Sequence, residues 1–258
     1  MKNPLLKIGL GILAAMFALI SYCNKGQINP VTGEKQWVSL TPQQEVALGL
    51  QSTPQMVAEF GGEYPDAKLQ QYVSEVGNKL VTNTEASKSS YQFGFHLLND
   101  SKTINAFALP GGQIFITYAL ISKLENEDQL AGVLGHEIGH VIARHGSQHM
   151  AKQELTQGLV GAAQVALSDP NNPNASAAIA QYVGNFINLK YGRNDELQSD
   201  KFGVKYMYQC GYKPEEMIGV MEILKAASGG GSQSDFMSTH PNPENRIEHI
   251  KEEIALIK

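Results

Sequence analysis

The chain has 258 residues, of which 42% are hydrophobic, and its 20 basic and 25 acidic side chains give a formal net charge of −5. This length is sufficient for one well-buried domain or two small ones. The near balance of charge argues against nucleic acid as the main partner, because phosphate binding needs a concentrated basic face.

Residues 1–23 are predicted to be an export signal. Lys2 and Lys7 flank the start of an apolar run over residues 9–21. At 1.5 Å per residue this run covers only about two thirds of a hydrocarbon core of roughly 30 Å. A short apolar run behind positive charge is typical of a bacterial-type export signal. An uncleaved N-terminal anchor is the alternative.

Cys23 decides where this signal ends. Residues 19–23 (LISYC) resemble a bacterial lipobox, although Tyr22 is bulkier than the small residue expected there. We expect Cys23 to be lipidated and to attach an exported, periplasmic protein to the membrane, with residues 24–40 as a polar tether. The alternative is ordinary cleavage to a soluble protein. Cys210 is expected to be a small buried apolar residue.

Two helices are predicted after the tether. Thr41 can cap a helix over residues 42–60 that has proline at its first position, and Gly61-Gly62 ends it. A second helix is predicted over residues 65–81, where apolar residues recur at three- and four-residue spacing.

A strand region follows. Residues 91–98, 104–109 and 113–117 are predicted strands, and Pro110-Gly111-Gly112 is a turn signal between the last two. Helices are predicted beyond them, with breaks at residues 169–174, 211–214 and 229–231. The order predicts an α+β domain over residues 41–258, mostly helical, with a small, mostly antiparallel sheet.

Residues 136–140 read His-Glu-Ile-Gly-His. On a helix, His136 and His140 lie about 40° apart around the axis, so their imidazoles can bind one Zn²⁺. Glu137 projects about 100° from His136, close enough to take the proton of an attacking water that the zinc acidifies. A chance match on a buried helix is the alternative.

Two nearby histidines are poor candidates for a further ligand. If the helix continues, His145 and His149 lie about 180° and 220° around from His136 and face away from the metal. The metzincin pattern HExxHxxGxxH fails as well, because Ala143 and Gly146 occupy its last two defining positions. We expect both histidines to face solvent or to pack against a neighbouring helix.

A later segment, residues 193–200 (RNDELQSD), offers the missing ligand. HEIGH followed about 56 residues later by an ExxxD helix resembles the gluzincins, and in detail the membrane-associated HtpX/BepA/LoiP-like metallopeptidases. The resemblance covers nearly the whole chain after the signal. It includes residues 29–33 (NPVTG), 105–112 (NAFALPGG), 238–241 (STHP) and 245–247 (NRI). The expected fold is therefore a zincin-type metallopeptidase domain with HEIGH on its active-site helix.

The resemblance implies that Glu196 is the third zinc ligand and that Asp200 accepts a hydrogen bond from a zinc histidine, His136. The four-residue spacing agrees, because both side chains can then face one direction, and metal-bound histidines usually have such an acceptor. Ser199 departs from the alanine that the family commonly has. The alternative is a solvated helix face on which Arg193 pairs with Glu196.

The resemblance also implies that the strand after the Pro-Gly-Gly turn forms an edge of the cleft and pairs with extended substrates. Its residues are Gln113, Ile114, Phe115 and Ile116. The alternative is a buried strand of the sheet.

His240 follows the glycine-rich residues 228–232, and three roles are open for it. It stabilises the oxyanion during attack, or it caps the zinc as a fourth ligand in a closed resting state, or it packs at the start of a helix.

These observations predict an envelope zinc endopeptidase with one Zn²⁺ per chain, acting on unfolded or misfolded proteins, with no nucleic acid partner. A chaperone-like assembly factor, whose zinc site the His240 loop holds closed, is the alternative. A structural zinc site is disfavoured, because such sites are closed sets of four Cys or His ligands.

Overall fold

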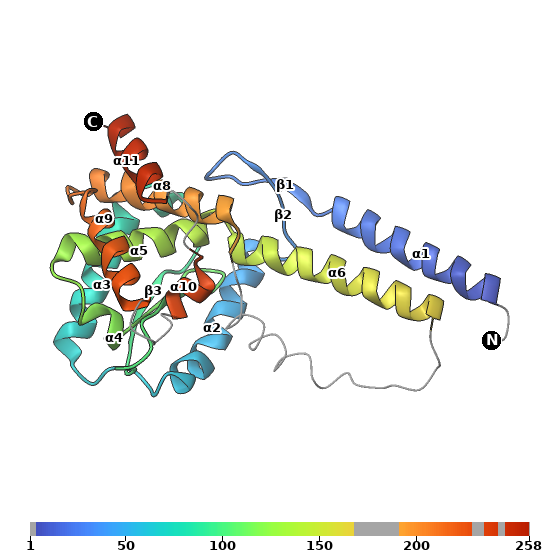
Figure 1. Cartoon of the computed structure of the whole chain (residues 1–258), viewed down its shortest axis with the longest axis horizontal. Coiled ribbons are helices and arrows are strands. Elements are labelled where there is room, and N and C mark those ends of the chain that lie inside the picture. The colour runs from blue at the N-terminus through green and yellow to red at the C-terminus, as the bar shows by residue number, and fades with distance from the viewer. Residues whose placement is uncertain (1–3, 168–190, 229–234, 242–245, 258) are drawn as a thin grey trace.

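The computed structural model describes residues 4–167, 191–228, 235–241 and 246–257. Helix α5, Glu127–Ile142, lies at the centre of the main body, between a small sheet and several other helices (Figure 1). Every residue of α5 from Gln129 onward is buried. The HEIGH segment is therefore helical, as predicted, and it is shielded from solvent.

The two predicted helices before the sheet are confirmed. Helix α2 is Pro42–Glu59 and begins at a capping box on Thr41. Helix α3 is Ala67–Thr82, and the Asp66 carboxylate caps it by accepting from two backbone N–H groups of its first turn. This cap moves the start of α3 two residues beyond the predicted one.

The main sheet has three strands: β3, Gly94–Leu98; β4, Ala106–Ala108; and β5, Gln113–Thr117. Their order is β3-β5-β4, so β5 is central. β4 runs antiparallel to β5, whereas β3 runs parallel to it. A separate antiparallel hairpin joins β1, Gly26–Ile28, to β2, Lys35–Trp37. The predicted sheet therefore has one antiparallel and one parallel pairing rather than a mostly antiparallel set, and the β1–β2 hairpin was not predicted.

Helix α8, Arg193–Gln209, packs along α5 at very short range. A Cβ added at Gly135 would lie 3.2 Å from the Gly203 Cα, and one at Gly139 would lie 3.1 Å from the Ser199 Cα. Small residues at these positions let the two backbones approach each other. The first turns of α8 thereby lie directly beside HEIGH.

The remaining helices lie around this pair, except for α6, which extends away from it. They are the 3-10 helix Glu85–Lys88, α4 (Tyr118–Ile121), α6 (His145–Leu167), α9 (Glu216–Ser228), α10 (Asp235–Thr239) and α11 (Arg246–Ile257). The predicted break at residues 211–214 is confirmed by the left-handed Gly211 (φ 77°), where α8 ends. The predicted breaks at 169–174 and 229–231 lie outside the described residues.

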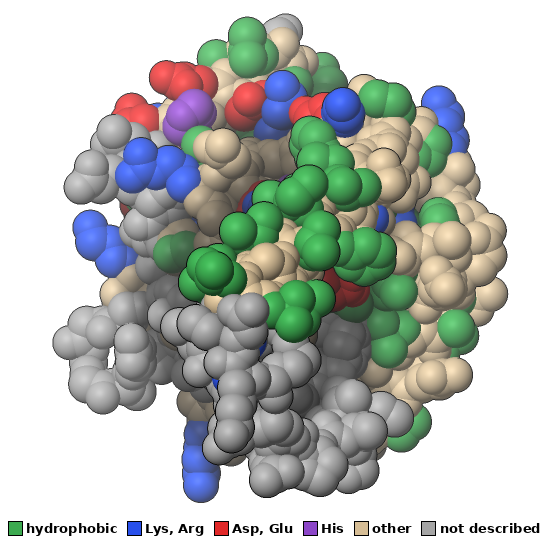
Figure 2. Space-filling view, turned by 90° about the vertical axis from the view of Figure 1, so that its right-hand side faces the viewer, with side chains coloured by type: hydrophobic (Ala, Val, Ile, Leu, Met, Phe, Trp, Pro, Cys, Tyr) green, Lys and Arg blue, Asp and Glu red, His purple; other side chains and the backbone are tan. Residues whose placement is uncertain are grey.

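The N-terminal helix α1, Pro4–Cys23, runs side by side with α6, and the pair projects from the main body (Figure 1). Seen from its free end, hydrophobic side chains gather on this projection (Figure 2). By length and composition Leu5–Cys23 could cross a membrane, but an export signal near an N-terminus has the same length and composition. The helix is longer than the predicted apolar run, so both readings of this segment stay open.

Residues 24–40 differ from the expected tether, because the β1–β2 hairpin packs against the main body. Asn29, Gln36 and Val38 are buried. Cys210 is half-buried, and its thiol contacts the Lys79 carbonyl at 3.5 Å.

Candidate active site and metal centre

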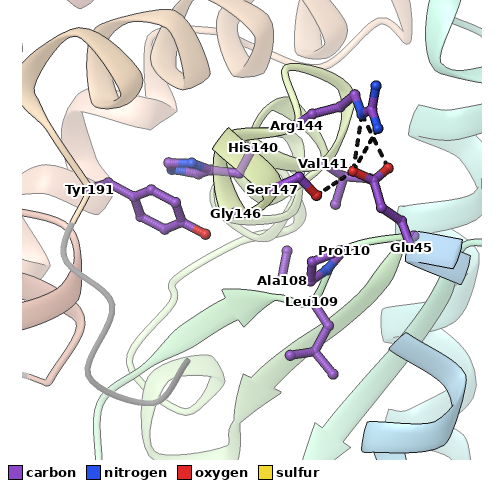
Figure 3. Close-up of a pocket in the computed structure, with 11 residues that line it drawn as sticks. Glu45, Ala108, Leu109, Pro110, His140, Val141, Arg144, Gly146, Ser147 and Tyr191 are labelled. Atoms are coloured by element: carbon purple, nitrogen blue, oxygen red, sulfur yellow. Dashed lines mark hydrogen bonds and ion pairs between the residues drawn. The ribbon is translucent and has the colours of Figure 1, made fainter. Parts of the chain in front are cut away.

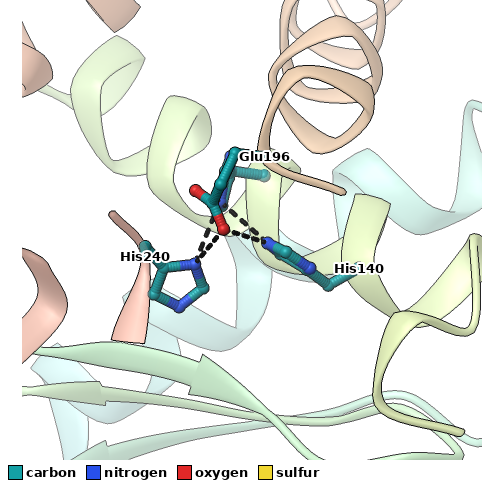
Figure 4. Close-up of side chains that lie close together, drawn as sticks. His140, Glu196 and His240 are labelled. Atoms are coloured by element: carbon teal, nitrogen blue, oxygen red, sulfur yellow. Dashed lines mark hydrogen bonds and ion pairs between the residues drawn. The ribbon is translucent and has the colours of Figure 1, made fainter. Parts of the chain in front are cut away.

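Four buried side chains converge at the face that α5 presents to α8. His136, His140, Glu196 and His240 each offer one ligand atom, and these atoms all lie within 4.8 Å of one another. Figure 4 shows the last three pointing toward a common centre. The Nε2 atoms of His136 and His140 are 3.0 Å apart, and His240 Nδ1 lies 3.4 Å from His136 Nε2 and 3.2 Å from Glu196 Oε1.

This donor set fits a zinc ion. Ligands at about 2.0–2.1 Å from a tetrahedral zinc lie about 3.3–3.4 Å from one another, which is close to the separations found here. Three imidazole nitrogens facing each other at this range repel one another unless protons or a cation lie between them. Imidazole and carboxylate are also ligand types that zinc accepts. His136, His140 and Glu196, with His240 as a fourth, would hold the metal.

Glu137 lies beside this cluster, as its position on the helix predicts. Its carboxylate is buried, and neither oxygen forms a hydrogen bond with any described residue. The nearest charged partner is His240, whose Nε2 lies 3.7 Å from Oε1. Burial raises the pKa of Glu137 above its usual range. Buried carboxylate oxygens without donors are rare in folded proteins, and they are characteristic of a group that works on a water or a ligand.

Asp200 lies beside His136, at the position where the resemblance implies a hydrogen-bond acceptor. Its Oδ1 lies 2.8 Å from His136 Nδ1. Arg246, the first residue of α11, donates to both Asp200 oxygens at 2.5 Å, and its Nη1 lies 3.0 Å from Glu196 Oε2. Burial raises the pKa of Asp200, but Arg246 and His136 outweigh it and hold that pKa below its usual range.

The alternative of a solvated helix face for Glu196 and Asp200 is excluded, because both side chains are buried. Arg246 was not predicted as part of the site. The only signal for it was its place in the 245–247 segment of the family resemblance, which assigned the arginine no role. Its partners lie about 50 residues away in the sequence, so only the fold brings them together.

The predicted direction of His145 around the helix axis is wrong, although its ring packs against the neighbouring helix α8, as expected. The prediction assumed a continuous helix, but α5 ends at Ile142 and α6 begins at His145 after a left-handed Arg144 (φ 58°). His145 is therefore turned inward and buried, with its Nδ1 2.9 Å from His140 Nδ1. Burial lowers the pKa of both histidines.

His149 is partly buried and contacts Asp195, with 2.8 Å between Nε2 and Oδ2. Neither His145 nor His149 belongs to the converging ligand set among the described residues, so their exclusion as ligands agrees with the geometry.

A buried ion pair holds the turn between α5 and α6. Arg144 Nε lies 3.0 Å from Glu45 Oε1, and its Nη2 donates to the Leu40 carbonyl at 2.6 Å. Ser147 and Tyr91 also donate to the Glu45 carboxylate. These contacts stabilise a positive φ that a non-glycine residue rarely adopts. Glu45, Arg144 and Ser147 line one side of a small pocket, and His140 and Tyr191 line another side (Figure 3).

The prediction that residues 113–116 form an edge strand for substrate is wrong, because β5 lies in the centre of the sheet. All five residues of β5 are buried, and Ile114, Phe115 and Ile116 pair with β3 on one side and β4 on the other. Their backbone cannot also pair with a substrate, so the buried-strand alternative for Gln113 to Ile116 holds. Among the described strands, β4 is an edge of this sheet.

The segment that carries His240 covers the site. The Phe236 N–H donates to the Ile104 carbonyl just before β4, and Tyr191 N–H donates to the Thr239 carbonyl. The His240 ring is fully buried and stacks on Phe236 at 4.4 Å between centroids. Burial would lower the pKa of His240, but Glu196 and Glu137 outweigh it and raise it. His240 thus lies among the ligand atoms rather than only packing beside them.

Comparison with known proteins relates the chain to metallopeptidases. The model of Peptidase family M48 matches residues 67–254. The beta-barrel assembly-enhancing protease of Yersinia pestis is 32% identical over 226 residues, which are 84% of this chain and 45% of that protein. The mitochondrial metalloendopeptidase OMA1 of Schizosaccharomyces pombe is 28% identical, over 86% of this chain and 65% of that protein. Metalloprotease YcaL of Escherichia coli is 27% identical, over 73% and 71%. The chain spans about half the length of the assembly-enhancing proteases that it matches.

Proposed function

The chain belongs to peptidase family M48 and is a zinc metallopeptidase, and from this premise we propose that it cleaves unfolded or stalled proteins of the cell envelope as an endopeptidase. The observation that carries the proposal is the cluster of His136, His140 and Glu196 beside a buried Glu137, neither oxygen of which forms a hydrogen bond with any described residue. The names of the assembly-enhancing protease and the OMA1 metalloendopeptidase support the same class of reaction.

The residues of the site have different roles in metal binding and in proton transfer. His136, His140 and Glu196 would hold zinc, which supplies Lewis acidity toward the scissile carbonyl and the attacking water. Glu137 accepts the proton of that water and passes it to the departing amine, as a general base and then a general acid. Its raised pKa suits this exchange, because a carboxylate whose pKa lies closer to neutrality accepts a proton more readily and can still return it.

We infer that β4, rather than β5, offers its backbone to an extended substrate. β4 is an edge of the described sheet and contacts α5, so a peptide paired with it would run past HEIGH. The α10 segment bonds to the Ile104 carbonyl at the start of this edge. The same segment would therefore cover both the peptide-binding edge and the metal.

The position of His240 favours a closed resting state, in which its Nδ1 is a fourth ligand. Replacing His240 with alanine should then raise cleavage of unfolded casein. If His240 instead stabilises the oxyanion, the same change lowers turnover by about 10²–10³ with zinc retained. The direction of the change in turnover distinguishes the two roles.

The alternative function is a chaperone-like assembly factor whose site stays closed. Glu137→Gln separates it from a peptidase, since it removes the general base without removing a ligand. We expect casein cleavage to fall by about 10²–10⁴, with zinc content unchanged. Full cleavage by this variant would contradict the proposal.

We propose that the protein is exported and attached to the membrane through Cys23 or the apolar α1. Lipidation predicts that Cys23→Ser moves the protein from the membrane fraction to the soluble fraction. Retention of this variant in the membrane favours an uncleaved α1 anchor instead.

A further inference from the structure

His140 has an outer partner of its own, and that partner is another imidazole. The Nε2 atom of His140 faces the ligand cluster, 3.0 Å from His136 Nε2, while its Nδ1 lies 2.9 Å from His145 Nδ1. Only one proton fits between two nitrogens at this distance. Which histidine carries it decides whether His140 offers a lone pair or an N–H to the metal.

A series of hydrogen bonds that begins at the surface shows which nitrogen of His145 carries the proton. Gln198 Nε2 lies 2.7 Å from a carboxylate oxygen of Glu34. A carboxylate only accepts, so this end of the Gln198 amide is its NH₂ group, and the other end is the oxygen. That oxygen, Oε1, lies 2.8 Å from His145 Nε2. An amide oxygen also only accepts, so His145 Nε2 carries a proton.

The position of the proton on His145 determines the tautomer of His140. His145 is buried and its neutral form has one ring proton, so its Nδ1 presents a lone pair. His140 Nδ1 must then donate, and His140 Nε2 presents a lone pair to the cluster. This is the form that binds zinc. The Ser199 hydroxyl, 3.4 Å from His145 Nδ1, is also able to donate to that atom.

The outer end of this chain is fixed by the β1–β2 hairpin. Asn29, which is buried, donates through Nδ2 to the Ile142 carbonyl at the end of α5, at 2.8 Å. Its Oδ1 accepts from the backbone N–H groups of Val31 and Thr32. The hairpin is thereby bound to the end of the HEIGH helix, and it holds Glu34 within reach of Gln198.

We propose that His145 is a positioning residue for the metal site, holding His140 in its zinc-binding tautomer, and that Gln198 and Glu34 orient His145. The inference rests on the proposed zinc site. It gives the N-terminal hairpin a part in that site, which the proposed function alone does not.

The test is zinc affinity of the full chain, measured by chelator competition. Removing an outer partner of a metal histidine typically weakens metal binding by 10–100-fold, and we expect a loss in that range, about 10–100-fold, for His145→Leu. His145→Asn places an amide oxygen near the position of Nδ1 and should recover most of the affinity. The matched control is His149→Leu, on the next turn of α6, which contacts Asp195 but no ligand and should bind zinc as the unchanged chain does.

A folded His145→Leu variant that binds zinc as tightly as the unchanged chain would overturn the inference. So would a His145→Asn variant as weak as His145→Leu. If the unchanged chain itself bound no zinc, the proposed function would fail instead.

A second measurement needs no variant. Nitrogen-15 NMR of the histidine rings in the zinc-loaded chain should show the His145 proton on Nε2 and the His140 proton on Nδ1. A His145 proton on Nδ1 would contradict the inference even if the variants do not fold.

Discussion

The two histidines of HEIGH lie one helical turn apart, yet opposite kinds of chemistry support them. Behind His136 is a buried ionic pair, Asp200 with Arg246, contributed by α8 and α11. Behind His140 is His145, a neutral imidazole, and a relay that reaches the surface. Removing either Asp200 or Arg246 should destabilise the fold strongly, because the other residue is left as an uncompensated buried charge. The support behind His140 contains no buried ion, so its loss should mainly affect the metal.

Charge balance explains why the two sides can differ. Glu137, Glu196 and Asp200 place three carboxylates around the cluster, and Arg246 is the guanidinium among them. When all are ionised the group is two charges negative, which suits a divalent cation. Because Arg246 already lies on the His136 side, no further charged side chain is needed behind His140 to offset the charge of the carboxylates and the metal.

The largest effect should come from the ionic side. Asp200→Ala leaves Arg246 buried without its main partner, and we expect a loss of about 3–5 kcal/mol in the free energy of unfolding. Gln198→Leu, on the neutral side, should cost about 1 kcal/mol. Urea denaturation of both variants measures the difference. Equal losses would remove the distinction between the two sides.

Arg246→Lys should have an intermediate effect. It keeps the positive charge but loses the planar fork that binds both Asp200 oxygens. We expect about 1–3 kcal/mol of lost stability, in the range for hydrogen bonds to charged groups, together with weaker zinc binding. A lysine variant indistinguishable from the unchanged chain in both urea and chelator titrations would show that charge alone supports His136.

The smallest effect is expected at the outer end of the relay. Glu34 is exposed and its bond to Gln198 is in contact with solvent, so Glu34→Ala should change stability by less than about 1 kcal/mol. Its zinc affinity should fall less than that of His145→Leu. If the zinc affinity of Glu34→Ala fell as far as that of His145→Leu, Glu34 would determine zinc binding as strongly as His145 does, and its proposed role of only orienting His145 would be wrong.

What the sequence predicted well depended on local spacing. The spacing within HEIGH and within ExxxD has fixed helical geometry, and each pair shares a helix face as predicted. The grouping of Glu196 and Asp200 with His136, which the structure also has, came from the family resemblance rather than from local spacing. His145 was misplaced because the helix breaks at Arg144, and that left-handed turn is held by Glu45, about 100 residues away.

The sheet also shows that local sequence predicts where a strand lies along the chain but not which strands pair with it. The residues of β5 were correctly predicted as a strand, but its central place follows from the parallel pairing with β3, which the order of strands in the sequence does not specify. Long-range partners of this kind also explain why Arg246 was missed.

The most direct test of the account is the zinc content of the purified full chain, measured together with casein cleavage. The account predicts one zinc per chain and cleavage that a chelator abolishes, while Glu196→Ala loses both metal and activity. A Glu196→Ala variant that keeps one zinc and full cleavage would contradict the site described here.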